Sequence, residues 1–140
     1  MHLSLTAISN TPEYSDYAIV GVINTETGRV ELQAEPLNPE AASYAISGSI
    51  DLRTGEIAIV AVSSTVGATT YTITGSLDPQ TCRLYYVRAK PGSFHRPKYN
   101  LSGAIGLGTG QVDLMAESQR SIHPNYTISN ATELRLVVNK

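Results

Sequence analysis

A unit of about 27 residues recurs along the chain, and this repetition constrains the fold more than any other feature. The units begin at tyrosines 17, 44, 71, 99 and 126, so successive units are offset by 27, 27, 28 and 27 residues. The second unit reads YAISGSIDLRTGEIAIVAVS and the third reads YTITGSLDPQTCRLYYVRAK. A repeat of this length is one supersecondary element that buries its apolar face only by packing against its neighbours. The sequence therefore predicts a single domain over residues 1–140, built from five copies of one element.

The first part of each unit alternates between apolar and small polar residues. In the second unit, Tyr44, Ile46 and Ile50 share one parity, whereas Ser47 and Ser49 have the other. Successive side chains of a strand point to opposite faces of a sheet. Each unit is therefore expected to open with a strand that buries one face.

A turn and a second alternating run complete the unit. The turns read NTETG, DLRTG, DPQTC and GLGTG. A polar first residue that bonds nearby amides, with glycine four places later, is typical of a hairpin loop of about four residues built on a type I turn. Cys82 takes the glycine position in the third unit, where a left-handed backbone disfavours any side chain. The inward positions of the return strands are predicted to be Val30, Leu32 and Ala34, then Ile57, Ile59 and Ala61, then Leu84 and Tyr86, then Val112, Leu114 and Ala116.

Both ends of the chain carry incomplete units. Leu3, Leu5 and Ala7 follow the return-strand pattern without a preceding first strand, which predicts an isolated return strand at the N-terminus. The last unit lacks about five residues of turn, and Asn130 replaces its glycine. Residues 134–138 resemble a final return strand, so the last unit forms either a tighter hairpin or one long bent strand.

Five hairpins joined side by side give an all-β, antiparallel up-and-down meander of about ten strands. A lone hairpin is marginally stable, so the units must pair, and a wide sheet with one apolar face must curl to bury it. Closure as a β-barrel also removes the exposed edges, and it is the predicted architecture; a two-sheet β-sandwich is the alternative. The glycines on the inward parity would lie at one level and allow the strands to bend; they are Gly21, Gly48, Gly75 and Gly103.

Cysteine content and charge distribution indicate the cellular compartment and the classes of partner to expect. Cys82 is the sole cysteine, so no internal disulfide can form, and the N-terminal residues carry no secretory signal pattern. We therefore expect a cytoplasmic protein without a membrane partner. Residues 1–80 carry two Arg against nine acidic residues, whereas residues 81–140 carry eight Lys or Arg against three. The acidic part would repel a phosphate backbone, so no nucleic-acid partner is expected, and the uneven charge would suit docking between subunits.

The unit tyrosines are the first candidates for a binding site. Each one occupies the first inward position after a long loop, so a barrel would gather them in a ring at one mouth. Tyrosine suits such a rim because its ring packs inward while its hydroxyl reaches water or a ligand. The loops at this mouth add aromatic and basic residues. The predicted ligand-binding residues are Tyr17, Tyr44, Tyr71, Tyr99, Tyr126, Phe94, His95, Arg96, Lys98, Arg120 and His123.

These residues predict a module that binds a small molecule or a glycan, and two other functions stay open. One is a structural or assembly protein without a small ligand. The other is a barrel-mouth isomerase or cyclase that uses His95 or His123 for acid–base chemistry. Three histidines without a Cys, Asp or Glu ligand pattern do not indicate a metal site, and no motif indicates a cofactor or a catalytic nucleophile.

The return strands of the second and third units carry apolar residues on both faces. The outward positions are predicted to be Ala58, Val60 and Val62 in the second unit, and Tyr85 and Val87 in the third. Apolar residues exposed together on an outer surface indicate an interaction site. A homo-oligomer that assembles through these strands is therefore expected.

Overall fold

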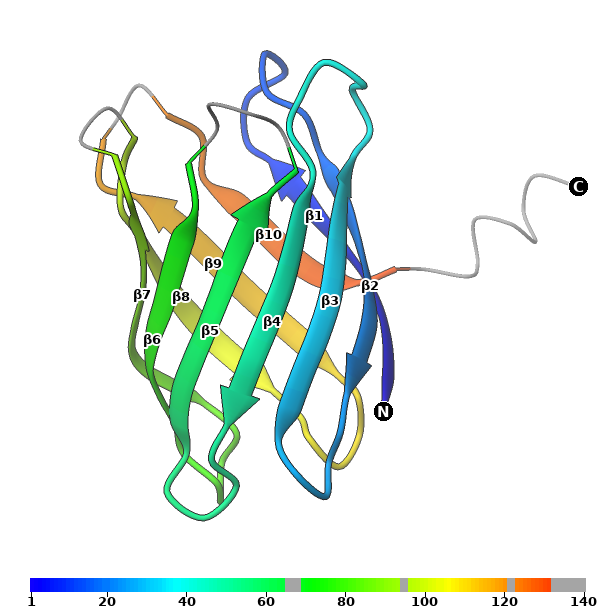
Figure 1. Cartoon of the computed structure of the whole chain (residues 1–140), viewed down its shortest axis with the longest axis vertical. Coiled ribbons are helices and arrows are strands. Elements are labelled where there is room, and N and C mark those ends of the chain that lie inside the picture. Colours follow the sequence, from blue (N-terminus) through cyan, green and yellow to red (C-terminus); the bar gives the residue numbers. More distant parts are fainter. Residues whose placement is uncertain (65–68, 94–95, 121–122, 132–140) are drawn as a thin grey trace, which may run out of the picture.

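The computed structural model describes residues 1–64, 69–93, 96–120 and 123–131, which form a closed antiparallel barrel of ten strands (Figure 1). The predicted barrel is confirmed, and the sandwich alternative is wrong. Long loops lie at one end and short turns at the other (Figure 1). No helix in the described part of the chain is long and apolar enough to cross a membrane. The strands are β1 (His2–Ser9), β2 (Tyr17–Ile23), β3 (Arg29–Pro36), β4 (Tyr44–Ile50), β5 (Glu56–Ser63), β6 (Tyr71–Leu77), β7 (Leu84–Pro91), β8 (Tyr99–Ile105), β9 (Val112–Ser118) and β10 (Tyr126–Asn130).

Pairing of β1 with β10 closes the barrel. Ala7 faces Ile128 and Ser9 faces Tyr126, which is the register that Ala61 and Ser63 adopt opposite the second unit's first strand. β1 is thus the return strand of the fifth unit, as its alternation predicts. The C-terminal strand expected over 134–138 lies outside the described residues, as does the choice between a tighter hairpin and one long bent strand.

The side chain of Asn130 joins β10 to the chain at the start of β9. In the earlier units the turn glycine's carbonyl accepts a hydrogen bond from a backbone amide of the next unit, as Gly55 does from Leu77 at 2.7 Å. In the fifth unit, Asn130 Nδ2 donates to the Gly110 carbonyl at 2.9 Å, and its Oδ1 accepts from the Val112 amide at 2.8 Å. An asparagine amide can donate and accept at once, so one side chain satisfies both backbone groups.

The apolar parity of the units faces the barrel interior, as predicted, except in the return strand of the third unit. The short-turn end is densely filled, and Val30, Ile50, Leu77 and Val112 there are almost fully buried. The isoleucines one level below the tyrosines are less tightly enclosed, and Ile46 and Ile73 are only partly buried. The core is therefore solid at the turn end and looser toward the long loops.

The short turns form as their sequences predict. Asp51 Oδ1 accepts hydrogen bonds from the amides of Arg53 and Thr54 at 2.9 and 3.2 Å. The Gly55 amide donates to the Asp51 carbonyl at 2.6 Å, and Gly55 has a φ of 83°. Cys82 occupies the same position in the third unit with a φ of 63°. A non-glycine residue therefore holds a left-handed conformation, which the sequence indicated.

Replacement of Cys82 by glycine is expected to raise the free energy of unfolding by about 0.5–1 kcal/mol. Removal of the side chain relieves the left-handed strain, and the gain is partly offset by the greater freedom of glycine in the unfolded chain. Urea denaturation measures the difference. Cys82→Ala is the matched control, since it removes the thiol but retains Cβ, and it should bring no such gain. Equal stabilisation by both substitutions would show that the thiol, rather than the backbone, is responsible.

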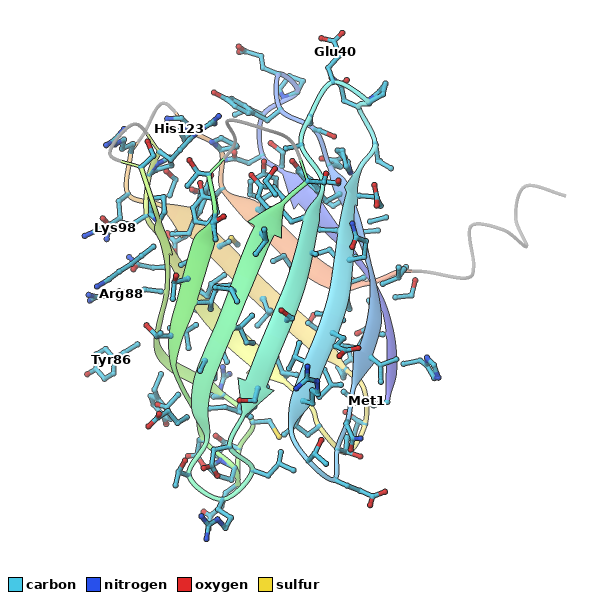
Figure 2. All side chains as sticks on the ribbon, viewed as in Figure 1. Met1, Glu40, Tyr86, Arg88, Lys98 and His123 are labelled. Carbon is cyan, nitrogen blue, oxygen red and sulfur yellow. The ribbon has the colours of Figure 1, made fainter. Side chains whose placement is uncertain are left out.

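The third return strand departs from the predicted alternation. Tyr86 was expected to face inward and Val87 outward, and both predictions are wrong: Tyr86 is 88% exposed and Val87 is 2% exposed. Tyr86 has a φ of 51°, and the pairing with β6 shifts register between Thr74 and Ser76. The extra residue of the 28-residue offset is thus absorbed as a β-bulge, which turns Tyr86 to the outer wall (Figure 2) and reverses the parity after it.

The outer wall carries the expected apolar residues on β5. Val60 and Val62 are 37% and 46% exposed. Tyr85 on β7 is also exposed, but it is paired with Ser76 of β6, whose partner on β5 is Glu56. Val60 is paired instead with Thr72, whose partner on β7 is Lys90. The apolar surface is therefore two separate strips rather than one face on adjacent strands. Assembly through β5 stays a prediction.

Candidate ligand-binding site

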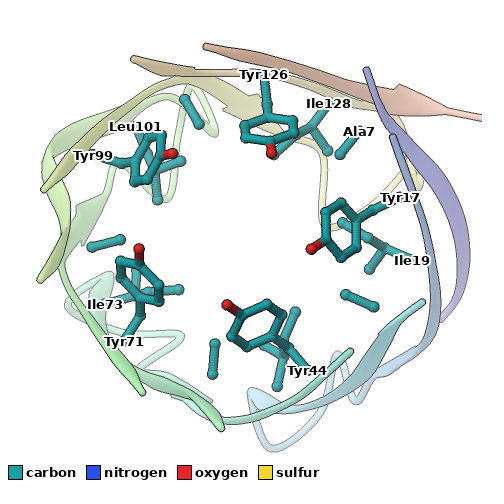
Figure 3. Close-up of a pocket in the computed structure, with 15 residues that line it drawn as sticks. Ala7, Tyr17, Ile19, Tyr44, Tyr71, Ile73, Tyr99, Leu101, Tyr126 and Ile128 are labelled. Carbon is teal, nitrogen blue, oxygen red and sulfur yellow. The ribbon is translucent and has the colours of Figure 1, made fainter. Parts of the chain in front are cut away.

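Five tyrosines form a closed ring at the long-loop end of the barrel (Figure 3). Neighbouring rings have centroids 6.2–6.4 Å apart and interplanar angles of 51–72°. This is the edge-to-face range in which aromatic rings attract one another. The ring members are Tyr17, Tyr44, Tyr71, Tyr99 and Tyr126, contributed by β2, β4, β6, β8 and β10.

A layer of alanines lies among these tyrosines and the residues below them. Each ring tyrosine is paired with an alanine of the preceding return strand; Tyr44 faces Ala34, and Tyr71 faces Ala61. On their other side the alanines face the next apolar residue down, as Ala61 faces Ile46. The layer consists of Ala7, Ala34, Ala61, Ala89 and Ala116. Small side chains at this level leave the barrel axis unfilled.

The unfilled space is a cavity of about 220 Å³ beneath the tyrosine ring (Figure 3). Its wall consists of the five tyrosines, the five alanines, four isoleucines and one leucine. The tyrosine hydroxyls are the side-chain polar groups of this wall, and they point toward the barrel axis (Figure 3). The site is therefore apolar in its depth and polar at its entrance.

The ring hydroxyls are protonated at neutral pH. Partial burial raises the pKa of Tyr17 to about 12 and raises the pKa of the other four ring tyrosines as well. The Tyr17 hydroxyl donates to the Ala42 carbonyl at 3.0 Å. Within the described part of the chain, the other four hydroxyls have no protein hydrogen-bond partner. Neutral phenols of this kind act as hydrogen-bond donors rather than bases, so the ring can hold a ligand oxygen.

A polar recess of about 440 Å³ lies above the ring, among the long loops. Its lining includes Glu40, Arg96 and His123 together with the ring tyrosines. The positive charge of Arg96 acts to lower the pKa of Tyr44 and Tyr71, against the larger effect of burial. It has the same effect on Tyr17, which lies on β2, although Arg96 belongs to the loop between β7 and β8. The field of Arg96 thus extends across the barrel mouth.

The structure brings together some of the predicted site residues and separates others. The five tyrosines, Arg96 and His123 meet at the mouth, where the His123 imidazole lies 6.3 Å from the ring of Tyr14. Lys98 and Arg120 line a different surface recess, which Arg96 also lines, and Lys98 projects away from the barrel (Figure 2). Phe94 and His95 lie outside the described residues.

Comparison of the chain with protein-family models, curated proteins and solved structures gives no match. The case for a site therefore rests on its geometry. Sequence reasoning missed the alanine layer as a site feature, although alanine recurs at one position of the return strands. Among the described residues, no group of three or more His, Cys, Asp or Glu side chains is placed to hold a metal ion.

Proposed function

We propose that this protein binds a small ligand with an apolar body inside the barrel, beneath the tyrosine ring. The contrast between the two ends of the interior supports this function. At the turn end, large side chains such as Ile50 and Leu77 fill the barrel completely. At the tyrosine end, the alternate strands β1, β3, β5, β7 and β9 each place an alanine next to the ring, and a cavity of about 220 Å³ remains. Interiors are normally packed without such space, and an apolar cavity is a ready binding site.

The lining favours an apolar body over a glycan. A sugar presents hydroxyl groups on all sides, and each one loses hydrogen bonds to water when it enters an apolar space. The cavity below the ring offers hydrocarbon from alanine, isoleucine and leucine, with hydroxyls at its upper rim. A compact hydrocarbon or aromatic body matches this lining, and the rim suits one polar group at the ligand's end.

The test is to fill the cavity by Ala61→Leu and to measure binding of naphthalene-2-methanol, a neutral probe with an apolar double ring. Ala61 lies in the cavity wall on β5, and the leucine would extend into the space. We expect saturable binding by the wild type in a fluorescence titration, and a loss of affinity of about tenfold or more in the variant, because the ligand and the leucine compete for one volume.

Ala58→Leu is the matched control, because it adds the same atoms to the outer face of the same strand. It should bind the probe as the wild type does, and thermal melting should show that both variants are folded. Absence of saturable binding by the wild type would contradict the proposed function. Equal affinities of Ala61→Leu and Ala58→Leu would also contradict it, since the probe would then bind elsewhere.

A further inference from the structure

We infer that the ligand of this site is a monocarboxylate whose apolar body fills the cavity and whose carboxylate lies at the tyrosine ring against Arg96. The inference rests on the proposed function and adds the chemical class of the ligand. It follows from the hydrogen-bonding groups of the rim, the charge above the rim and the size of the space below it.

The tyrosine hydroxyls at the rim can donate hydrogen bonds to a ligand that carries acceptor atoms. Tyr44, Tyr71, Tyr99 and Tyr126 present neutral hydroxyls toward the axis without a partner in the described part of the protein. A carboxylate has two oxygens with about four lone-pair sites and no proton to donate, so it can accept from several hydroxyls at once. Hydrogen bonds from hydroxyls to an ionised carboxylate are also stronger than those between neutral groups.

The charge above the rim selects an anion. Arg96 lines the recess directly over the ring, and its charge acts on Tyr17, Tyr44, Tyr71 and Tyr99. Glu40 lines the same recess, but it forms no ion pair with Arg96 among the described residues. A guanidinium without a carboxylate partner is suited to bind a ligand carboxylate.

The cavity volume sets the size of the apolar body. An apolar cavity of about 150 Å³ in a protein core accepts benzene. The space beneath the tyrosine ring is about 220 Å³, which is larger by roughly half. It therefore suits a body of about ten carbon atoms, such as two fused aromatic rings or a short branched chain. The ring edges around the entrance would contact this body on all sides.

Three probes with one naphthalene ring and different head groups separate the contributions. They are 2-naphthoate, naphthalene-2-methanol and naphthalen-2-ylmethylammonium, titrated into the full chain at pH 7 and low salt. We expect the carboxylate to bind about tenfold or more tightly than the alcohol, and the ammonium to bind most weakly, because hydrogen bonds to a charged group are stronger than those between neutral groups.

Single substitutions test whether Arg96 and the ring hydroxyls cause the preference for the carboxylate. Arg96→Gln should weaken 2-naphthoate about tenfold and leave the alcohol within about twofold, because it removes the charge and retains a polar side chain. Lys98→Gln removes a neighbouring positive charge that points away from the mouth, and it should change neither affinity by more than about twofold. Tyr71→Phe keeps the ring and removes one hydroxyl donor, so it should weaken 2-naphthoate more than the alcohol.

The outcomes distinguish failure of the inference from failure of the proposed function. If the alcohol or the ammonium binds as tightly as 2-naphthoate, or if Lys98→Gln has the effect of Arg96→Gln, the carboxylate assignment is overturned while binding in the cavity stands. If none of the probes binds saturably, or if Ala61→Leu leaves their binding unchanged, the proposed function fails and the inference fails with it.

Discussion

Gly48→Ala is expected to lower the free energy of unfolding by about 3 kcal/mol or more. Gly48 lies within β4 at a φ of 148°, a conformation that residues with a side chain rarely adopt. A Cβ atom there would overlap the Ala58 carbonyl oxygen and would lie 2.7 Å from the Ile59 Cα, both in the backbone of the paired strand. Backbone strain and overpacking each cost roughly 1–3 kcal/mol, and neither strand can move without disturbing the barrel ladder.

Gly108→Ala provides the comparison for this experiment. Gly108 lies in the last short turn, and a Cβ atom built there meets no heavy atom within 4 Å. The substitution should change the free energy of unfolding by less than about 0.5 kcal/mol. Urea denaturation at pH 7 compares both variants with the wild type. A typical mutation changes the free energy of unfolding by about 1 kcal/mol. If Gly48→Ala lowered it by no more than this, the close contact between β4 and β5 at Gly48 would be contradicted.

Alkaline pH is expected to destabilise the barrel through the tyrosine ring. Burial raises the pKa of all five ring tyrosines above the value of about 10 that tyrosine has in an unfolded chain. Between these values the unfolded chain ionises and the folded chain does not, so the free energy of unfolding falls as pH rises. The fall should begin near pH 10 and continue through about pH 12, the folded pKa of Tyr17. Below pH 10 the ring imposes no such dependence.

Tyr17→Phe tests the assignment of this pH dependence. It should cost about 1 kcal/mol at pH 7, because the hydrogen bond from the Tyr17 hydroxyl to Ala42 is lost. Above pH 10 the free energy of unfolding should fall less in Tyr17→Phe than in the wild type. The difference should reach roughly 1 kcal/mol, after allowance for solvent screening of the half-exposed ring. Urea denaturation from pH 8 to pH 11.5 gives both slopes. Parallel slopes would show that ring ionisation does not control the alkaline transition.

The architecture could be predicted from the sequence because four units repeat the same pattern and a fifth repeats part of it. The tyrosine, glycine and alternating apolar positions recur at similar offsets from unit to unit. Positions that the units share can therefore be distinguished from residues that are peculiar to one unit. The turns could also be predicted, including the left-handed conformation of Cys82, because the conformation of a short turn depends on neighbouring residues alone. The tyrosine ring follows from the same repetition once the strands are closed.

The features that sequence reasoning missed depend on distant segments. The inserted residue in β7 was visible as an offset of 28, but only pairing with β6 decides that Tyr86 carries the bulge. The cavity arises because alanines from five separate hairpins meet at one depth, and no single unit reveals the space between them. Arg96 lines the barrel mouth as well as the recess of Lys98 and Arg120, and this placement likewise depends on loop paths that no periodic pattern encodes.

The junction of β1 with β10 has a consequence for synthesis on the ribosome. The fifth hairpin is made of β1 and β10, the first and last of the described strands, with Leu5 opposite Asn130. β1 emerges first among the ten strands and β10 emerges last, so one margin of β1 stays without its partner while the rest is translated. An open sheet margin is prone to pairing with other chains. Nascent copies on neighbouring ribosomes are therefore most exposed to misassembly until residue 130 is released, and the finished cylinder then has no such margin to offer.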